Sequence, residues 1–388
     1  MNELEKVLDK QILEFGEFSE DSLDIEEKKL DLEELMNYSL FEPIEGWKVE
    51  HFNEEQKTTN LDVFNNKTIF SDSFLNKDYS CFTVCQSMNS FYLFTILDDE
   101  DNKELLIMCS TESESKFKRI KKLDISYSIW RKLFSLGPKP QSLIKAFDLE
   151  FDGSMIQKCL QEKEEKELLQ MENLEIPRNY KFGVLYIKDK QKTQEEYITN
   201  VEISKEFQDF LDILGDPVTL LGWKKYRGGL DVKHNASGET SIYTEWNDFS
   251  IMFHVLTLLP YNEKDSQQVT RKKHIGNDVV VIAFIDGNTT FLPSSFKSKQ
   301  NHIFIAVKPL KDDEEIKYQL EVSMRNCVPQ YEPYLPLPPI VKKNELRDFL
   351  LTKACQGERI AQKSGKFFDR FVNFRRSLLE EIWERYQY

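Results

Sequence analysis

The chain has 388 residues, of which 40% are hydrophobic and 12% aromatic, and it carries 52 Lys and Arg against 67 Asp and Glu, a formal net charge of −15. This length allows two domains of ordinary size, each with its own core. The composition is that of a soluble globular protein. No apolar run approaches the ~20 residues of a membrane-spanning helix, so we expect no direct membrane insertion. No basic stripe of the kind that binds nucleic acid is visible, so we expect no nucleic-acid partner.

The N-terminal 40 residues form an acidic leader. The first 50 residues carry −11 of the total charge, with weak helical spacing that fits either a solvated, partly disordered leader or a helix docking on a partner. The start, MNELEKVLDKQ, lacks the basic and apolar regions of a signal peptide, so we expect a cytoplasmic protein. The six cysteines show no zinc-ligand spacing, which favours buried, reduced thiols and no metal site.

Residues 41–178 are expected to form a mainly β domain. From Trp47 to about Asp152 the stretches SCFTVCQSM, SFYLFTIL and ELLIMCST read as short strands, and DDEDN reads as a turn. A charged stretch, MIQKCLQEKEEKELLQM, is expected to be helical and leads to EIPRNY, where Pro177 marks a domain boundary.

Residues 179–328 alternate between strands and helices. KFGVLYIK, SIYTEW, SIMFHVLTLL, VVVIAFID and NHIFIAVKPL read as strands, while SKEFQDFLDILG, which stops at Gly215, and EKDSQQVTRKKHI read as helices. This alternation favours an α/β sheet covered by helices, within an α+β chain. A proline-rich connector over 329–342 and a helical segment over 343–388 complete the predicted organisation.

The motifs of common enzyme classes are missing. Four of the five histidines fall between His234 and His302, yet the sequence has no HExxH pair, no GxSxG elbow and no GxxxxGK[ST] loop. His254, within the apolar FHV, is expected to be a core residue rather than a catalytic one.

Two polar segments remain as candidates. In RKKHIGND, Gly276 is a plausible helix terminator, and Asn277 and Asp278 then lie at the mouth of a buried strand, an edge where α/β proteins commonly place function. An ordinary cap and turn explains the same residues equally. In RGGLD, the paired glycines beside Arg227 allow a close backbone approach or simply a turn.

A family resemblance connects these segments. KFGVLYIK, the region through RGGLDVKH, TSIYTEW, RKKHIGNDVVVIAF and NHIFIAV, in that order, resemble the catalytic domain of the Rap GTPase-activating proteins. The resemblance is clear from about Lys181 to Phe368, and thinner from about Tyr79 to Asn179, where family members carry a dimerisation domain. HIGND and GGLD also resemble segments of tuberin-like proteins that act on Rheb, while RGGLD and FLLTK favour the Rap branch.

The resemblance implies a mechanism and a partner. It implies that the chain stimulates GTP hydrolysis on a Rap-like small GTPase in its GTP form, with Asn277 as an asparagine thumb that positions the attacking water. His274 is expected to brace the thumb or contact the GTPase, or else to be a packed histidine. The remaining expected GTPase-binding residues are the cations Arg271, Lys272 and Lys273, which would attract the acidic, phosphate-bearing face of the partner, together with Asp278, Arg227 and Asp231.

No cofactor of its own is expected, because GTP and Mg²⁺ belong to the GTPase, and no activity is expected without that partner. Another Ras-family substrate such as Rheb, and a non-catalytic dimerising scaffold, remain as alternatives. A homodimer is left open, and membrane recruitment is expected through the lipidated GTPase.

Overall fold

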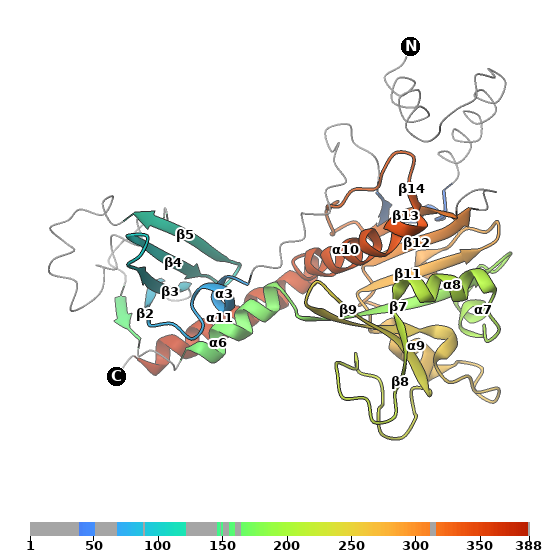
Figure 1. Ribbon diagram of the computed structural model, residues 1–388, viewed down its shortest axis with the longest axis horizontal. Helices are drawn as coiled ribbons and strands as arrows, with labels where there is room; N and C mark the ends of the chain where they lie inside the picture. Colours follow the sequence, from blue (N-terminus) through green and yellow to red (C-terminus); the bar gives the residue numbers. More distant parts are fainter. Residues whose placement is uncertain are drawn as a thin grey trace, which may run out of the picture. The chain divides into compact units, whose positions relative to one another are not determined.

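The computed structural model describes residues 39–50, 68–87, 90–121, 146–147, 149, 155–159, 164–310 and 316–386. These fall into two compact units that interleave along the chain (Figure 1). The larger unit holds residues 39–50 with Lys181–Glu245 and Ser250–Glu358; the smaller holds the described parts of Phe64–Tyr180 with Trp246–Phe249 and Arg359–Tyr388. The acidic leader predicted for residues 1–40 lies almost entirely outside the described residues.

A mixed sheet forms the centre of the larger unit, in the order β1-β13-β12-β11-β7-β10-β9-β8, with β14 also paired to β13. Its central strands β7, β11 and β12 are parallel, and β13 is antiparallel to β12 (Figure 1). The strands are β1 (Trp47–Val49), β7 (Asn179–Lys188), β8 (Asp216–Thr219), β9 (Thr240–Trp246), β10 (Phe249–Val255), β11 (Val280–Asp286), β12 (Ile303–Leu310), β13 (Lys317–Arg325) and β14 (Ile340–Lys342).

Local sequence explains most of these elements. Strand β11 is a continuous apolar run because both of its neighbours are parallel strands in the interior of the sheet. Helix α8 (Lys205–Leu214) begins where the Ser204 hydroxyl accepts the Phe207 N–H at 3.2 Å, buries one apolar stripe, and ends at Gly215 as predicted. The other helical segments of this unit are α7 (Gln194–Ile198), η3 (Leu256–Leu258), α9 (Val269–Gly276), η4 (Pro293–Ser295) and α10 (Lys343–Gln362).

Two predicted elements of this unit are shorter than expected. Strand β10 ends at Val255, and a 3-10 turn replaces the rest of SIMFHVLTLL. Helix α9 begins only at Val269, because Gln268 adopts a left-handed conformation with φ 45° and residues before it form turns. The Asp265 carboxylate accepts the Val269 N–H at 2.8 Å and so supplies the start signal.

Residues 39–50 form a strap on the larger unit. Leu40 and Phe41 lie in its core, and Phe41 forms a parallel bridge with Phe291. Strand β1 pairs with β13 and so belongs to the sheet of the larger unit. The strands that follow β1 in the sequence, β2 to β6, form the sheet of the smaller unit. The strap ends at Glu50, whose carboxylate is 2.6 Å from the fully buried ammonium group of Lys353.

The smaller unit is built on a five-stranded sheet in the order β5-β4-β3-β2-β6, with antiparallel pairing throughout. The three strands expected from the sequence are present, but Met155–Lys158, which was expected to be helical, is strand β6. The strands are β2 (Tyr79–Ser87), β3 (Ser90–Asp99), β4 (Glu104–Ser110), β5 (Ser115–Lys121) and β6 (Met155–Lys158).

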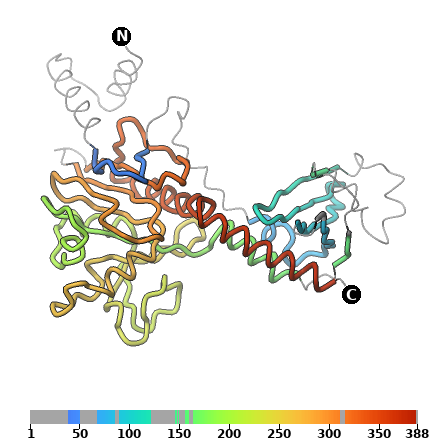
Figure 2. The backbone as a smooth tube through the Cα atoms, turned by 180° about the vertical axis from the view of Figure 1, so that it is seen from behind, coloured from blue at the N-terminus to red at the C-terminus, as the bar shows by residue number. Residues whose placement is uncertain are grey.

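Helices α3 (Ile69–Ser73), α6 (Glu165–Glu175) and α11 (Gly365–Arg385) pack in one apolar cluster with strands β2, β3 and β4. Figure 2 shows α11 running alongside α6. The C-terminal segment, expected as one helical stretch, is thus two helices separated at residues 363–364. The architecture of the whole chain is mixed α+β, as the sequence predicted.

Candidate functional site

The segment RKKHIGND is divided between a helix and its exit. Helix α9 ends at Gly276, and Asn277 is its C-cap with φ −99° and ψ 2°. The Asn277 N–H donates to the His274 carbonyl at 3.0 Å, which closes the last turn of the helix. The side chain of Asn277 is exposed, and it forms no hydrogen bond with the part of the chain that the structure describes.

The last carbonyl groups of α9, which a helix leaves without partners, are held by side chains from other segments. Asn301 Nδ2 donates to the carbonyl oxygens of Ile275 at 2.9 Å and Asp278 at 2.7 Å. The Ser298 hydroxyl donates to the Gly276 carbonyl, and Lys181 Nζ donates to the Asn277 carbonyl at 2.8 Å. The backbone around Asn277 is therefore fixed while its carboxamide is left free.

Asp278 is fully buried behind Asn277. Its Oδ2 atom is 2.9 Å from His254 Nδ1, and its Oδ1 atom is 3.3 Å from the Lys181 ammonium group. Gly183 on β7 permits this approach, since a Cβ atom there would lie 3.1 Å from Oδ2. Asp278 is thus an internal anchor for the end of α9, and the expected contact with a GTPase does not fit its buried position.

His254 joins the exit of helix α9 to the RGGLD loop. Its ring is 1% exposed, with Nδ1 facing the Asp278 carboxylate and Nε2 lying 2.9 Å from the Gly228 carbonyl oxygen. Both ring nitrogens of His254 are therefore engaged, which fixes the ring between the two segments. Gly228 has φ +61°, and a Cβ atom there would lie 3.2 Å from Nε2, which explains why this close approach needs glycine.

Asp231 organises the loop that follows. Its carboxylate accepts the N–H groups of Lys233, His234 and Ala236 at 3.1, 2.9 and 2.9 Å. These hydrogen bonds, above all that from Ala236, hold the pKa of the Asp231 carboxyl below its usual range. Asp231 therefore orders the loop, whereas Arg227 is exposed on it and is free to meet a partner.

His274 lies between the loop and the buried pair. Its Nε2 is 3.3 Å from the Ser237 hydroxyl, which also accepts the Asp231 N–H, and its ring centroid is 5.1 Å from that of His254. Burial, reinforced by His254, lowers the pKa of His274 to about 4. A neutral, half-buried His274 therefore packs helix α9 against the loop that follows RGGLD.

Arg271 does not face outward. Its side chain is 1% exposed, and its guanidinium donates to the carbonyl oxygens of Ile198 at 2.7 Å, Asn200 at 2.8 Å and Leu259 at 2.9 and 3.1 Å. The expectation that Arg271 attracts a partner is corrected by this burial, because a guanidinium with these contacts cannot reach another protein. It ties the chain after α7 and the chain after β10 to the start of α9.

The two lysines that follow Arg271 are available to different degrees. Lys272 is half-buried, and its ammonium group lies 3.3 Å from Glu195 Oε1 and 3.1 Å from Gln267 Oε1. Lys273 is exposed and forms no ion pair with the described residues. Of the three expected cations, Lys273 is therefore the one best placed to meet an anionic partner.

Asn277 and Asp278 lie at the mouth of strand β11, as the sequence predicted. Asn277 precedes β11, and Lys181 lies near the start of β7, so the site is at the amino ends of the parallel strands. The carboxyl ends, where open α/β sheets commonly bind ligands, lie at the opposite edge. Parallel pairing could have identified Lys181 as a site residue. Val281 pairs with Gly183, so the start of β7, which holds Lys181, lies beside the start of β11.

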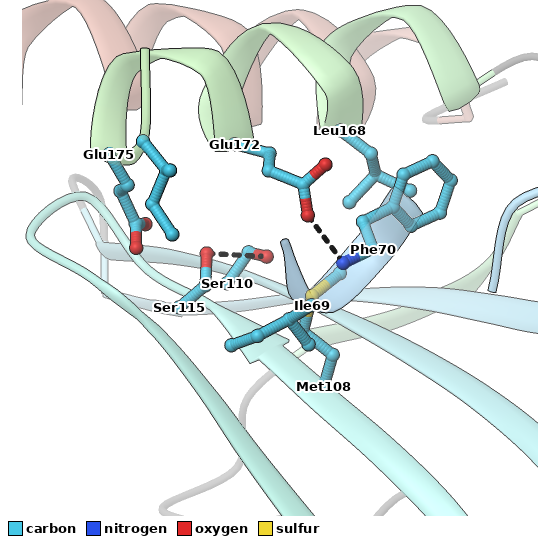
Figure 3. A pocket seen from close by; sticks show the side chains of 9 residues that line it. Ile69, Phe70, Met108, Ser110, Ser115, Leu168, Glu172 and Glu175 are labelled. Atoms are coloured by element: carbon cyan, nitrogen blue, oxygen red, sulfur yellow. Dashed lines mark hydrogen bonds between the residues drawn. The ribbon is translucent and has the colours of Figure 1, made fainter. Parts of the chain in front are cut away.

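Nothing in the described residues suggests a cofactor site elsewhere. No group of three or more potential ligands there could hold a metal ion, and no helix among them is long and apolar enough to cross a membrane. A cavity of about 30 Å³ in the smaller unit lies beside α6, where Glu172 accepts the Phe70 N–H at 2.6 Å (Figure 3). This volume admits ordered water but is too small for an organic cofactor.

Comparisons with known proteins place the site in a family. Residues 197–376 match the Rap/ran-GAP family model. The chain is 38% identical over 288 residues to the GTPase-activating Rap/Ran-GAP domain-like protein 3 of Gallus gallus, a match that covers 72% of this chain and 30% of that relative. It is 28% identical over 420 residues to the RapA guanosine triphosphatase-activating protein 1 of Dictyostelium discoideum, covering 91% of this chain and 39% of the relative.

Among solved structures, the TSC2 GAP domain is similar, with 28% identity, a TM-score of 0.43, and coverage of 47% of this chain and 96% of that one. The chain spans about a quarter to a third of the length of the first curated relatives, 30%, 24% and 29%. The matched residues 197–376 include both the RGGLD loop and the RKKHIGND segment. On these matches, residues 197–376 of this chain are a domain of the Rap/ran-GAP family.

Proposed function

We propose that this protein stimulates GTP hydrolysis on a Rap-like small GTPase by inserting the Asn277 side chain beside the bound nucleotide. The observation that carries the proposal is the contrast at Asn277 between an exposed, unengaged carboxamide and a backbone held by the side chains of Lys181, Ser298 and Asn301. GTP and Mg²⁺ would be supplied by the GTPase. Membership of the family, whose curated members include proteins named as GTPase-activating, supports the activity.

The chemistry suits a carboxamide. A GTPase hydrolyses GTP slowly because the attacking water is poorly held in line with the γ-phosphate. An amide oxygen can accept a hydrogen bond from this water while the NH₂ group donates to a phosphate oxygen, so one rigid group sets the direction of attack. The amide is neutral and is not repelled by the triphosphate, whereas an aspartate at position 277 would add a negative charge and lose both donors.

The expected effect of removing the thumb is large. A GAP acceleration of about 10⁵ corresponds to roughly 7 kcal/mol of activation free energy. Loss of one preorganised group that meets the transition state typically costs about 3 to 4 kcal/mol, or a factor of roughly 10² to 10³ in rate. We expect Asn277→Ala to lose this factor in the maximal rate yet still bind the GTP-loaded GTPase.

Single-turnover phosphate release at saturating protein tests this, with Asn277→Asp as the isosteric variant. Asn326→Ala is a matched control, because Asn326 is also exposed in the larger unit but lies next to the end of β13. A near-wild-type rate for Asn277→Ala would refute the assignment. A fall in binding without a change in the maximal rate would make Asn277 a docking residue instead.

Rap-like GTPases are the substrates favoured here. The relative named for RapA activation is similar over 91% of this chain, which supports this class of substrate. The choice is tested with a panel of GTP-loaded Ras-family proteins, including Rap and Rheb, assayed for multiple-turnover phosphate release. Faster hydrolysis by Rheb than by Rap would reassign the substrate, and no acceleration of any member would leave a non-catalytic scaffold as the function.

A further inference from the structure

A second basic segment, Lys297-Ser298-Lys299, lies against the end of the thumb helix. The Ser298 hydroxyl donates to the carbonyl of Gly276, the residue directly before Asn277. Both flanking lysines are exposed. One hydrogen bond therefore brings two cations into the neighbourhood of the carboxamide from a segment that follows it by some 20 residues in the sequence.

The position of this segment does not depend on its lysines. Arg325 donates to the carbonyl oxygens of Ser298 and Asn301, each at 2.8 Å. Asn301 in turn holds the end of α9 through the Ile275 carbonyl. Substitution of the exposed lysines would leave all of these hydrogen bonds in place, so the lysines can be tested without disturbing the thumb.

The cations here outnumber the described carboxylates beside them. Lys181 and Lys273, with Lys297 and Lys299 on either side of Ser298, belong to segments that meet at the end of α9, whereas the Lys272 ammonium group turns back toward Gln267. Asp278 is paired with Lys181, and Glu195 is paired with Lys272 and also lies close enough to Lys297 to interact with it. Lys299 and Lys273 form no ion pair within the described residues. In a chain of net charge −15, this local excess of positive charge is the reverse of the average surface.

We propose that Lys297 and Lys299, together with Lys273, form a cationic rim around Asn277 that docks the anionic face of the GTPase, where carboxylates and phosphates border its nucleotide. This rests on the proposed function. Exposed charges at the edge of an interface act mainly by steering the encounter, so the rim sets KM and its salt dependence and leaves the chemical step to Asn277. An anionic lipid surface is disfavoured as the occupant, because a membrane bound to the rim would cover the carboxamide that it surrounds.

The test compares the double variant Lys297→Gln/Lys299→Gln with the control Lys205→Gln/Lys343→Gln. The control removes the same charge from exposed lysines in the larger unit, one at the start of α8 and the other at the start of α10. Phosphate release from a GTP-loaded Rap protein gives kcat and KM at ionic strengths of about 0.05 M and about 0.5 M. We expect the rim variant to raise KM about tenfold at low salt and about twofold at high salt, with kcat unchanged.

Several outcomes would overturn the rim. An unchanged KM in the rim variant would show that the lysines do not dock the GTPase. An equal rise of KM in the control variant would make the effect one of net charge. A fall of kcat at unchanged KM in the rim variant would make the lysines catalytic. Binding of the wild-type protein to phosphatidylserine vesicles that is lost in the rim variant, with unchanged GTPase kinetics, would assign the cations to a membrane. If the wild-type protein accelerates none of the GTPases in the panel, the proposed function fails. If the wild-type protein does accelerate hydrolysis and the rim variant gives the same kcat and KM, only the rim fails.

Discussion

Replacing Arg271 by methionine tests whether this residue holds the site together or contacts the GTPase. The guanidinium is buried and donates to three backbone carbonyl groups, those of Ile198, Asn200 and Leu259. Methionine keeps an unbranched chain with good helix propensity but removes every donor. The variant therefore isolates the hydrogen bonds from the packing of the aliphatic part.

The magnitude follows from these three acceptors. A buried acceptor that loses its partner costs about 1 to 3 kcal/mol, and the three together would reach at most about 9 kcal/mol. Burial of the guanidinium, which lowers the pKa of Arg271, shows that part of this gain is already offset by the cost of desolvating the charge. We therefore expect Arg271→Met to reduce the free energy of unfolding by about 3 to 5 kcal/mol, a large part of the roughly 5 to 15 kcal/mol of a typical domain.

Urea denaturation followed by circular dichroism measures this loss, and GTPase kinetics below the transition measure KM. Lys273→Met is the control, since it removes an exposed cation from the same helix and should change the free energy of unfolding by less than about 0.5 kcal/mol. A variant at position 271 that unfolds at the wild-type urea concentration but shows a raised KM would refute the reasoning and restore Arg271 as a contact residue.

Two further predictions concern the network behind the thumb. The pKa of His274 is lowered to about 4 by burial and by His254, from an ordinary 6.5, so the unfolded chain binds the extra proton first as pH falls. The free energy of unfolding should therefore decline from pH 6.5 to about 4, and urea denaturation of His274→Gln across this range should show a shallower decline if His274 is responsible. Gly228→Ala should lower the Tm more than Gly229→Ala, since both have positive φ but only at Gly228 would the new Cβ crowd Met252, at 3.1 Å, and His254, at 3.2 Å. Equal losses of Tm would mean that backbone strain alone sets the cost.

Local patterns were enough to predict the strands and helices whose determinants lie within them. The apolar run of β11 and the amphipathic α8, with Ser204 before it and Gly215 after it, depend on residues that are neighbours in the sequence. The start of α9 could not be read in this way. EKDSQQ is compatible with a helix, but Gln268 turns back to hydrogen-bond with both backbone groups of Asn262 and adopts a left-handed conformation instead.

The burial of Arg271 could have been predicted from helical spacing, although its position in a run of basic residues suggested an exposed side chain. Arg271 precedes Ile275 by four residues, and both are buried on the same stripe of α9, while Lys272 and Lys273 fall on other faces. Periodicity thus separates the internal cation from the external ones. The three basic residues were interpreted alike as exposed cations, but successive residues of a helix lie on different faces, so only some of them are exposed.

The partners that hold the thumb could not have been predicted from local pattern, because they come from separate segments. Lys181, His254 and Asn301 contact the thumb segment from β7, β10 and the chain before β12. The helix-to-strand pattern marked Asn277 and Asp278 as candidates, but only the resemblance gave Asn277 a catalytic role. The supporting residues are visible once parallel pairing sets the strand starts side by side.

The arrangement of charge behind Asn277 explains how an aspartate can directly follow the proposed thumb residue. A carboxylate one residue from a group that enters a triphosphate site would repel the nucleotide if it were exposed and unpaired. Asp278 is instead turned inward, with Lys181 at 3.3 Å and His254 at 2.9 Å from its two oxygens. Lys181 also holds the Asn277 carbonyl at 2.8 Å, so one ammonium group both offsets the negative charge and fixes the backbone that presents the amide. The same buried contact that anchors the end of α9 would therefore also keep the surroundings of the proposed thumb compatible with phosphate.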